Sequence, residues 1–441
     1  MPRPEPRRAA GAPLTALVLQ GGGALGAYQA GAYEALATRA HEVGWVAGIS
    51  IGAINAALIA GNPPARRLER LRAFWEQVSL ALPVSASGTV LEPVRGWWDD
   101  AMALWGAWRG VPGFFQPRPW WAWWPQPPAS LYDTAPLRAT LGELVDFDLL
   151  NDGPVRLSIG AVDVQSGNFA YFDNRHERIG PEHVLASGAL PPGFGAVQIG
   201  ERWYWDGGLV SNTPLAYVMD ELDAEAGTPV TVFQIDLFSA RGRLPRTLAD
   251  AAEREKDIRF SSRTRMVSDL VRDRHQLHQR LRRLAELLPP ERRHSAAVQD
   301  LLAGLADPTI TLVHVIHRRK AYETQTKDYE FSRLSMTEHW QAGLADMAAS
   351  FALLRRQPAP RPGEFRVLDY RADIAPPGGR AGRFCRSPSE ARPAPERTRT
   401  GLPEAAPAPA SNHFLRFEPY LERPWLRPST PVESSEPRMM W

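Results

Sequence analysis

The pentapeptide Gly48-Ile49-Ser50-Ile51-Gly52 lies between a short apolar run and a helix-like run at residues 53–60. This order predicts a strand, a sharp turn and a helix, with Ser50 at the bend. Gly48 and Gly52 allow the backbone to turn tightly, because a Cβ atom at either position would clash. The turn would expose the serine hydroxyl and direct the free N–H groups of the helix toward developing charge. This is the arrangement of a serine nucleophile, although an ordinary glycine turn has the same pattern.

The composition is that of a large globular protein, with 441 residues of which 44% are apolar. The formal net charge of +2 indicates no strong attraction to nucleic acid. A single cysteine, Cys385, excludes internal disulfides and a thiolate metal cluster, and favours a reducing compartment. No run of 18 apolar residues is present, and we expect no cleaved signal peptide. We therefore expect a cytoplasmic protein, with peripheral membrane contact as a further expectation.

The first sixty residues predict an α/β fold. Residues 14–20 read as a short buried strand, and residues 24–38 have apolar side chains at helical spacing. The next predicted strand ends at Ser50. Two strands that are each followed by a helix predict a right-handed βαβ unit in a mostly parallel sheet covered on both faces.

The glycine-rich segment Gly21-Gly22-Gly23-Ala24-Leu25-Gly26 fits the pattern G-x-G-x-x-G between a strand and a helix. A dinucleotide site would require an acidic residue at the end of the second strand, where this chain has Ser50. Glu42 lies before that strand, at its wrong end. The other interpretation is an oxyanion hole, because consecutive glycines expose backbone N–H donors without side chains in the way.

A nucleophilic serine needs a base, and Asp206 is the candidate with a distinctive setting. It follows the predicted strand at residues 203–205 and precedes Gly207 and Gly208. A carboxylate shielded from water can have a raised pKa and can take the serine proton directly. None of the ten histidines has a comparable local setting.

Two stretches between the predicted core elements are inserts. Residues 79–130 lose clear periodicity and are rich in tryptophan, whereas residues 247–305 have a helical composition. The tryptophans of the first insert are Trp97, Trp98, Trp105, Trp108, Trp120, Trp121, Trp123 and Trp124. We expect residues 13–355 to form the catalytic domain, with a flexible start at residues 1–12. The Pro- and Arg-rich residues 358–441 are expected to form a disordered tail.

Taken in this order, the motifs resemble those of the patatin-like phospholipases, the lipid acyl hydrolases with a Ser-Asp dyad. The resemblance covers residues 14–355, and residues 329–340 resemble a bacterial subgroup with a C-terminal extension. It includes the segment Ala186-Ser187-Gly188-Ala189-Leu190-Pro191-Pro192 before the aspartate. One departure is Leu25, where many members carry Arg or Lys.

The resemblance implies a three-layer α/β/α fold and assigns the site residues. Ser50 would be the nucleophile, Asp206 the general base and the Gly21, Gly22 and Gly23 amides the oxyanion hole. The residues that would support these motifs are Gly26, Gly48, Gly52, Gly207, Gly208 and Asn212. The implied reaction needs no histidine, metal or cofactor.

The expected substrate is a lipid or another acyl ester, and nucleic acid is not an expected partner. Two alternatives stay open. One is an esterase that acts on a thioester or a storage polyester, and the other is a non-catalytic lipid-binding scaffold with the same fold. Because tryptophan suits the interface between membrane and water, residues 95–125 are either a lid or lipid-docking surface or a local core.

Overall fold

The predicted βαβ unit forms the centre of the structure. β1 (Leu14–Leu19) and β2 (Trp45–Ile49) are neighbouring parallel strands. A 3-10 turn, η1 (Gly23–Gly26), and α1 (Ala27–Ala37) connect them. β2 is buried at all its residues and β1 at all but the first, which explains why both strands are continuously apolar.

The computed structural model describes residues 13–39, 41–80, 92–119, 129–222, 229–261, 264–303, 305, 308–318 and 323–369. All of these residues belong to one unit, Met1–Pro377. The expected flexible start at residues 1–12 lies outside them, as do residues 370–441 of the expected tail.

The main sheet has nine described strands in the order β11-β10-β9-β1-β2-β5-β8-β7, and β6 pairs with β5. The strands from β11 to β5 in this order run parallel to one another, whereas β6 and β8 are antiparallel to β5 and β7 is antiparallel to β8. The bounds not yet given are β5 (Arg156–Asp163), β6 (Phe169–Asp173), β7 (Val197–Ile199), β8 (Arg202–Asp206), β9 (Pro229–Asp236), β10 (Thr309–Ile316) and β11 (Phe365–Asp369).

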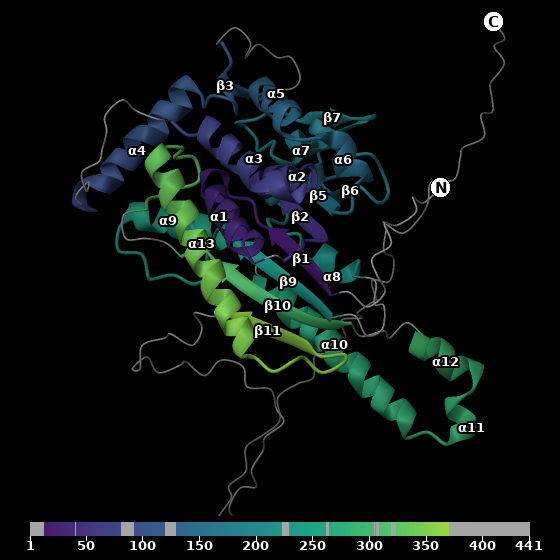
Figure 1. The fold of residues 1–441 in the computed structure, drawn as a ribbon. Coiled ribbons are helices and arrows are strands. Elements are labelled where there is room, and N and C mark those ends of the chain that lie inside the picture. The colour runs from purple at the N-terminus through teal and green to yellow at the C-terminus, as the bar shows by residue number, and fades with distance from the viewer. Residues whose placement is uncertain are drawn as a thin grey trace, which may run out of the picture. The chain divides into compact units, whose positions relative to one another are not determined.

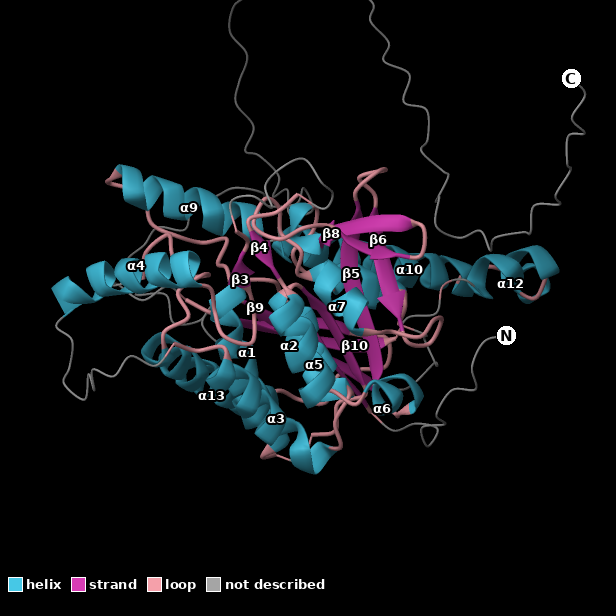
Figure 2. Cartoon of the chain, turned by 90° about the horizontal axis from the view of Figure 1, so that it is seen from above, coloured by secondary structure: helices cyan, strands magenta, loops and turns pink. Residues whose placement is uncertain are grey.

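Helices cover both faces of this sheet (Figures 1 and 2). On one face, Leu17 and Leu19 of β1 join a core cluster with residues of α1, α2 and α13. On the other face, Ala16 and Val18 join a second cluster with residues of α8 and α10. Because alternate residues of one strand enter separate cores, the fold has the three-layer α/β/α arrangement that the sequence predicted.

The helices have the following bounds: α2 (Ile51–Ala60), α3 (Pro64–Gln77), α4 (Glu92–Arg109), α5 (Ala135–Leu144), α6 (Phe147–Asp152), α7 (Pro181–Ser187), α8 (Leu215–Asp220), α9 (Leu248–Phe260), α10 (Thr264–Glu286), α11 (Pro290–Arg293), α12 (Ala296–Ala303) and α13 (Arg333–Arg356). A short hairpin of β3 (Gln116–Pro117) and β4 (Tyr132–Asp133) lies apart from the main sheet. Within the described residues, no helix combines the length and the hydropathy that a membrane span requires.

Two expected irregular stretches contain regular structure. The tryptophan-rich insert holds an 18-residue helix, α4, although residues 81–91 and 120–128 of that insert lie outside the described residues. The expected tail is corrected at its start, because β11 (Phe365–Asp369) pairs with β10 as the edge strand of the sheet. The strand is only five residues long and lies in charged, Pro-rich sequence, so it gives no clear strand pattern in the sequence. Pairing with β10 provides the backbone partners that so short a strand lacks by itself.

The helices α1 and α13 pack against each other without room for a side chain at two points. A Cβ atom at Gly31 would lie 1.9 Å from the carbonyl oxygen of Trp340, and one at Gly343 would lie 1.9 Å from that of Tyr28. The two glycines therefore allow the helix backbones to meet directly. This contact joins the N-terminal βαβ unit to the last helix of the described chain.

We expect Gly343→Ala to destabilise the protein by about 1–3 kcal/mol, because the added methyl group must push α1 and α13 apart. The matched control is Gly142→Ala in α5, where an added Cβ meets no atom within 4 Å. This control should stabilise the fold by about 0.5–1 kcal/mol, since alanine is the better helix former. Urea denaturation of the three proteins measures both effects, and an unchanged free energy of unfolding for Gly343→Ala would contradict the direct packing.

Candidate active site

The turn after β2 holds Ser50 in a backbone conformation that L-residues rarely adopt. Its φ of 55° and ψ of −123° make it the one described non-glycine residue with positive φ. Gly48 and Gly52 are required by close approach, because a Cβ at Gly48 would lie 2.3 Å from the Gly52 carbonyl oxygen. A Cβ at Gly52 would lie 2.4 Å from the carbonyl oxygen of Leu19. Backbone strain at a half-buried serine in a tight turn, with close packing on both sides, is typical of functional positions.

The pairing of β5 places the ends of β2 and β8 next to each other. Gly160 of β5 pairs with Ile49 on one edge and with β6 on the other. The next residue, Ala161, pairs with β6 and with Asp206 of β8. Because β6 occupies one edge at both positions, β2 and β8 must share the opposite edge and meet end to end. Ser50, which follows Ile49, is therefore adjacent to Asp206.

The carboxylate of Asp206 is buried, with 3% of the residue exposed. The N–H of Gly208 donates a hydrogen bond to it at 2.7 Å, and the side chain of Ser50 lies beside it. Burial raises the pKa of Asp206 to about 6, although hydrogen-bond interactions with Ser50 and Gly208 lower it in part. Gly207 allows the close fit, because a Cβ there would lie 2.8 Å from the Gly160 carbonyl oxygen.

The glycine loop after β1 lies against Ser50. A Cβ at Gly21 would be 3.1 Å from the Cβ of Ser50 and 2.3 Å from Oδ1 of Asn212. Asn212 clamps this residue from two sides, since its carbonyl oxygen accepts the Gly21 N–H at 3.1 Å and its Nδ2 donates to the Gly21 carbonyl at 2.9 Å. Asn212 was expected from the sequence only as a supporting residue, and these two hydrogen bonds show that it supports Gly21.

The two hydrogen bonds between Asn212 and Gly21 remove Gly21 from the predicted oxyanion hole. Because the N–H of Gly21 already donates to Asn212, it is not available to a substrate in this structure. The N–H groups of Gly22 and Gly23 have no acceptor among the residues that the structure describes. The candidate donors are therefore Gly22 and Gly23, and Gly21 has a structural role.

The C-terminal part of the chain supports the same loop. Gly23 has a φ of 54°, and a Cβ there would lie 2.0 Å from the carbonyl oxygen of Asp328. That carbonyl also accepts the N–H of Ala24 at 2.7 Å. Gly26 packs on Ile51 and Trp75, so the loop is also held against the start of α2.

Two family models match the chain. A family model described as patatin-like phospholipase matches residues 17–219, and a second, described as patatin phospholipase, matches residues 258–362. The chain belongs to the patatin-like phospholipase family. The first match contains Ser50, Asp206 and the glycine loop, and the second contains Asp328 and α13. Membership of this family supports lipid acyl hydrolase activity.

Two solved structures resemble the patatin-like chain only distantly. VipD from Legionella pneumophila has 13% sequence identity and a TM-score of 0.34, over 77% of this chain and 67% of that chain. Human GIVD cytosolic phospholipase A2 has 11% identity and a TM-score of 0.38, over 79% of this chain and 60% of that chain. Likenesses at these scores do not assign an activity. Among curated proteins, no sequence matches the chain.

Ser187 of the patatin-like chain is a residue whose role the sequence did not reveal. Its hydroxyl accepts the Ser50 N–H at 2.9 Å and donates to the Gly160 carbonyl at 2.7 Å, so it ties the turn to β5. The segment that contains it resembled the family, but nothing in that segment indicated this contact. Gln20 acts similarly at the end of β1, where its Oε1 accepts the N–H groups of Leu237 and Phe238.

No histidine hydrogen-bonds to Ser50 or Asp206 within the described part of the patatin-like chain. His183 instead accepts the Gly180 N–H at 2.9 Å through its Nδ1 atom. His317 and His339 belong to a second buried group with Glu323. Burial would raise the pKa of Glu323, but charge and hydrogen-bond interactions with both imidazoles lower it well below its ordinary value.

The raised pKa of Asp206 predicts an unusual dependence of stability on pH. The unfolded chain loses this proton near the ordinary value of 3.8, whereas the folded protein retains it to about 6. Asp206 therefore does not lower the free energy of unfolding below about pH 4, where it is protonated in both states. It lowers that free energy in full above about pH 6, where the buried carboxylate is ionised. We expect Asp206→Asn to stabilise the protein by about 1–3 kcal/mol at pH 8 and to have little effect at pH 4.

Urea denaturation of the wild type and of Asp206→Asn at both pH values measures this difference. The control is Asp133→Asn, which changes a half-buried carboxylate that accepts hydrogen bonds from the N–H of Ala135 and from Nε2 of Gln116. Asp133→Asn should show no gain in stability at pH 8. Equal or lower stability of Asp206→Asn at pH 8 would contradict a raised pKa at this position.

Proposed function

We propose that the protein is a lipid acyl hydrolase in which Ser50 and Asp206 act as a catalytic dyad. The observation that carries the proposal is the placement of Ser50 directly beside the buried Asp206 carboxylate, at the shared edge of β5. A serine hydroxyl becomes a nucleophile when an adjacent base can take its proton. Asp206 is adjacent, accessible to that proton, and ionised above about pH 6.

In the acylation step, the Ser50 oxygen forms a bond to the ester carbonyl carbon while its proton passes to Asp206. The carbonyl oxygen becomes an oxyanion, which accepts hydrogen bonds from the N–H groups of Gly22 and Gly23. The bond between the carbonyl carbon and the alcohol oxygen then breaks. Asp206 returns the proton to the leaving alcohol, and the acyl group stays on Ser50 as an ester.

In the deacylation step, a water molecule attacks the acyl carbon and gives its proton to Asp206. The bond to Ser50 breaks, Asp206 returns the proton to the serine oxygen, and the carboxylic acid leaves. The helix α2 begins directly after Ser50, so its N-terminal N–H groups and dipole favour negative charge at the same position. The same residues would cleave a thioester or a storage polyester, and substrate profiling separates these esters from phospholipids.

The exposed face of α4 suggests how the enzyme meets lipid. Trp97, Leu104, Trp105 and Trp108 fall on one side of the helix and are 71%, 69%, 42% and 72% exposed. On the opposite side of α4, Arg95 forms ion pairs with Asp99 at 2.8 Å and with Glu338 at 3.2 Å, and the second pair connects α4 to α13. An apolar face turned outward, with tryptophan as its main residue, suits the membrane interface. We propose that α4 docks the enzyme on lipid surfaces.

Replacement of either member of the dyad should abolish hydrolysis. We expect Ser50→Ala and Asp206→Asn each to lower kcat/KM on phospholipids and short-chain esters by about a thousandfold or more. For the wild type, kcat/KM should fall as the pH drops below about 6, because the base must be ionised. A panel of lipid and ester substrates, assayed from pH 4.5 to 9, measures both effects.

A fluorophosphonate probe should label the wild type and leave Ser50→Ala unlabelled. Ser350→Ala is the matched control, since Ser350 is fully buried and its hydroxyl donates only to a carbonyl of its own helix. This control should keep both labelling and activity. Full activity in Ser50→Ala or Asp206→Asn would refute the dyad, and a chain that neither reacts with the probe nor hydrolyses any ester would support the scaffold alternative.

Removal of the α4 tryptophans should weaken lipid binding. We expect the triple variant Trp97→Ala, Trp105→Ala, Trp108→Ala to lose most of its binding to phosphatidylcholine and phosphatidylglycerol vesicles in a flotation assay. The control replaces Leu270, Leu277 and Leu284 of α10, which are 70%, 55% and 59% exposed, by alanine. Unchanged flotation of the tryptophan variant, or an equal loss in both variants, would contradict docking through α4. The tryptophans at 120, 121, 123 and 124 lie outside the described residues.

A further inference from the structure

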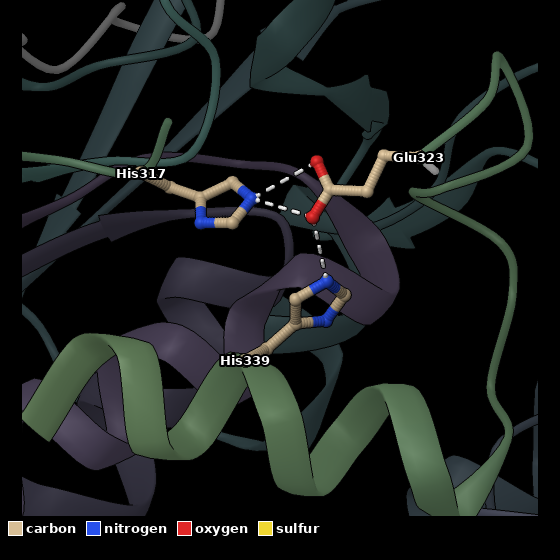
Figure 3. A group of neighbouring side chains, drawn as sticks. All are labelled: His317, Glu323 and His339. Atoms are coloured by element: carbon tan, nitrogen blue, oxygen red, sulfur yellow. Dashed lines mark hydrogen bonds and ion pairs between the residues drawn. The ribbon is translucent and has the colours of Figure 1, made fainter. Parts of the chain in front are cut away.

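His317, Glu323 and His339 come together from three separate segments of the chain (Figure 3). His317 follows β10, Glu323 lies in the segment that leads toward α13, and His339 is on α13 itself. The carboxylate lies between the two imidazoles, and the Nε2 atom of each ring points toward it. None of these residues has a role in the proposed hydrolysis.

The spacing of the three side chains is that of ligands around one metal ion. Nε2 of His317 lies 3.1 and 3.3 Å from the two carboxylate oxygens of Glu323, and Nε2 of His339 lies 3.4 Å from Oε1. One ligand atom from each residue falls within 4.8 Å of the others. Metal–ligand bonds of about 2.0–2.1 Å at tetrahedral angles separate neighbouring ligand atoms by roughly 3.3 Å.

All three residues are also buried, with exposed fractions of 3%, 4% and 4% for His317, Glu323 and His339. Placing a carboxylate and two imidazoles together in the interior is costly unless strong interactions compensate their lost hydration. A divalent cation provides such interactions, because it binds the carboxylate and both ring nitrogens at the same time. Two imidazole nitrogens and one carboxylate oxygen form a donor set that zinc takes in proteins.

We propose that His317, Glu323 and His339 bind one divalent transition-metal ion, with zinc as the principal candidate. The three side chains leave a fourth position for a water molecule. His317 also lines an open hollow together with Lys327, Glu253, Asp257 and several arginines, so one of the three proposed ligands borders a cavity.

Metal binding requires the Nε2 lone pair of each imidazole, so the ring proton must lie on Nδ1. Nδ1 of His339 has no hydrogen-bond partner among the described residues. A metal-bound His339 would therefore need a water molecule to accept its Nδ1 proton, since ligand histidines normally donate that proton to an acceptor. Without metal, both Nε2 atoms can instead carry protons and donate to Glu323, which is the competing arrangement.

The metal ion would have a structural role, because it would fix the segment that contains Glu323. Glu323 is five residues before Asp328, whose carbonyl accepts the Ala24 N–H beside the glycine loop. On the other side, the ring of His317 packs edge-to-face against Tyr28 of α1 at 5.1 Å between ring centroids. An ion that holds Glu323 to β10 and α13 would thereby hold the segment that supports Gly23 and Ala24.

The test measures metal content and stability of the full chain, without an activity assay. We expect about one zinc ion per chain after purification without chelator. Removal with EDTA should lower the midpoint of thermal unfolding, and Zn²⁺ should restore it, whereas Mg²⁺, which prefers oxygen ligands, should not. Glu323→Gln and His339→Asn should bind Zn²⁺ at least tenfold more weakly by calorimetry.

His183→Asn is the matched control, because His183 is also a buried histidine beside glutamates but lies outside the cluster. This control should keep the metal content of the wild type. If the cluster variants do not fold, X-ray absorption at the zinc edge of the wild type still reports whether two imidazoles and one carboxylate ligate the ion. A wild-type chain without metal, whose unfolding midpoint responds to neither EDTA nor Zn²⁺, would overturn the proposal and leave a hydrogen-bonded His–Glu–His group.

Discussion

The candidate site depends on one structural constraint, which is that β2 and β8 share the same edge of β5. The two strands run in opposite directions and meet where Ile49 pairs with Gly160 and Asp206 pairs with Ala161. This arrangement places a strained serine beside a buried carboxylate. The burial that raises the pKa of Asp206 costs stability at neutral pH, and the same burial makes the carboxylate a stronger base for the reaction that we propose.

Around this pair, neighbouring groups approach several glycines more closely than a side chain at those positions would allow. Gly21 meets Asn212, Gly23 meets the Asp328 carbonyl, Gly52 meets the end of β1, and Gly207 meets β5. The glycines are thus required as much by packing as by backbone conformation. As a result the glycines of this loop differ in role, since Gly21 is held by Asn212 whereas the N–H groups of Gly22 and Gly23 have no acceptor within the described part of the chain.

The part of the chain after residue 258, which the second family model matches in large part, is structurally tied to the first part. Asp328 holds the glycine loop, α13 packs directly on α1, and β10 extends the parallel sheet beside β9. The proposed metal site lies at this junction, since its residues come from the end of β10, the segment before Asp328, and α13. The C-terminal elements therefore belong to the support of the site and are not a separate addition to it.

Local sequence was sufficient for the βαβ unit, the turn at Ser50 and the candidate roles of Ser50 and Asp206, because short apolar runs and glycine spacing are local signals. Those signals were missing for β11 and for α4, whose stability depends on partners distant in sequence. The contact between Ser50 and Asp206, the engagement of Gly21 by Asn212, and the gathering of His317, Glu323 and His339 were decided only by the tertiary structure. Strand order and register bring such residues together, and no local pattern encodes the choice of edge on β5.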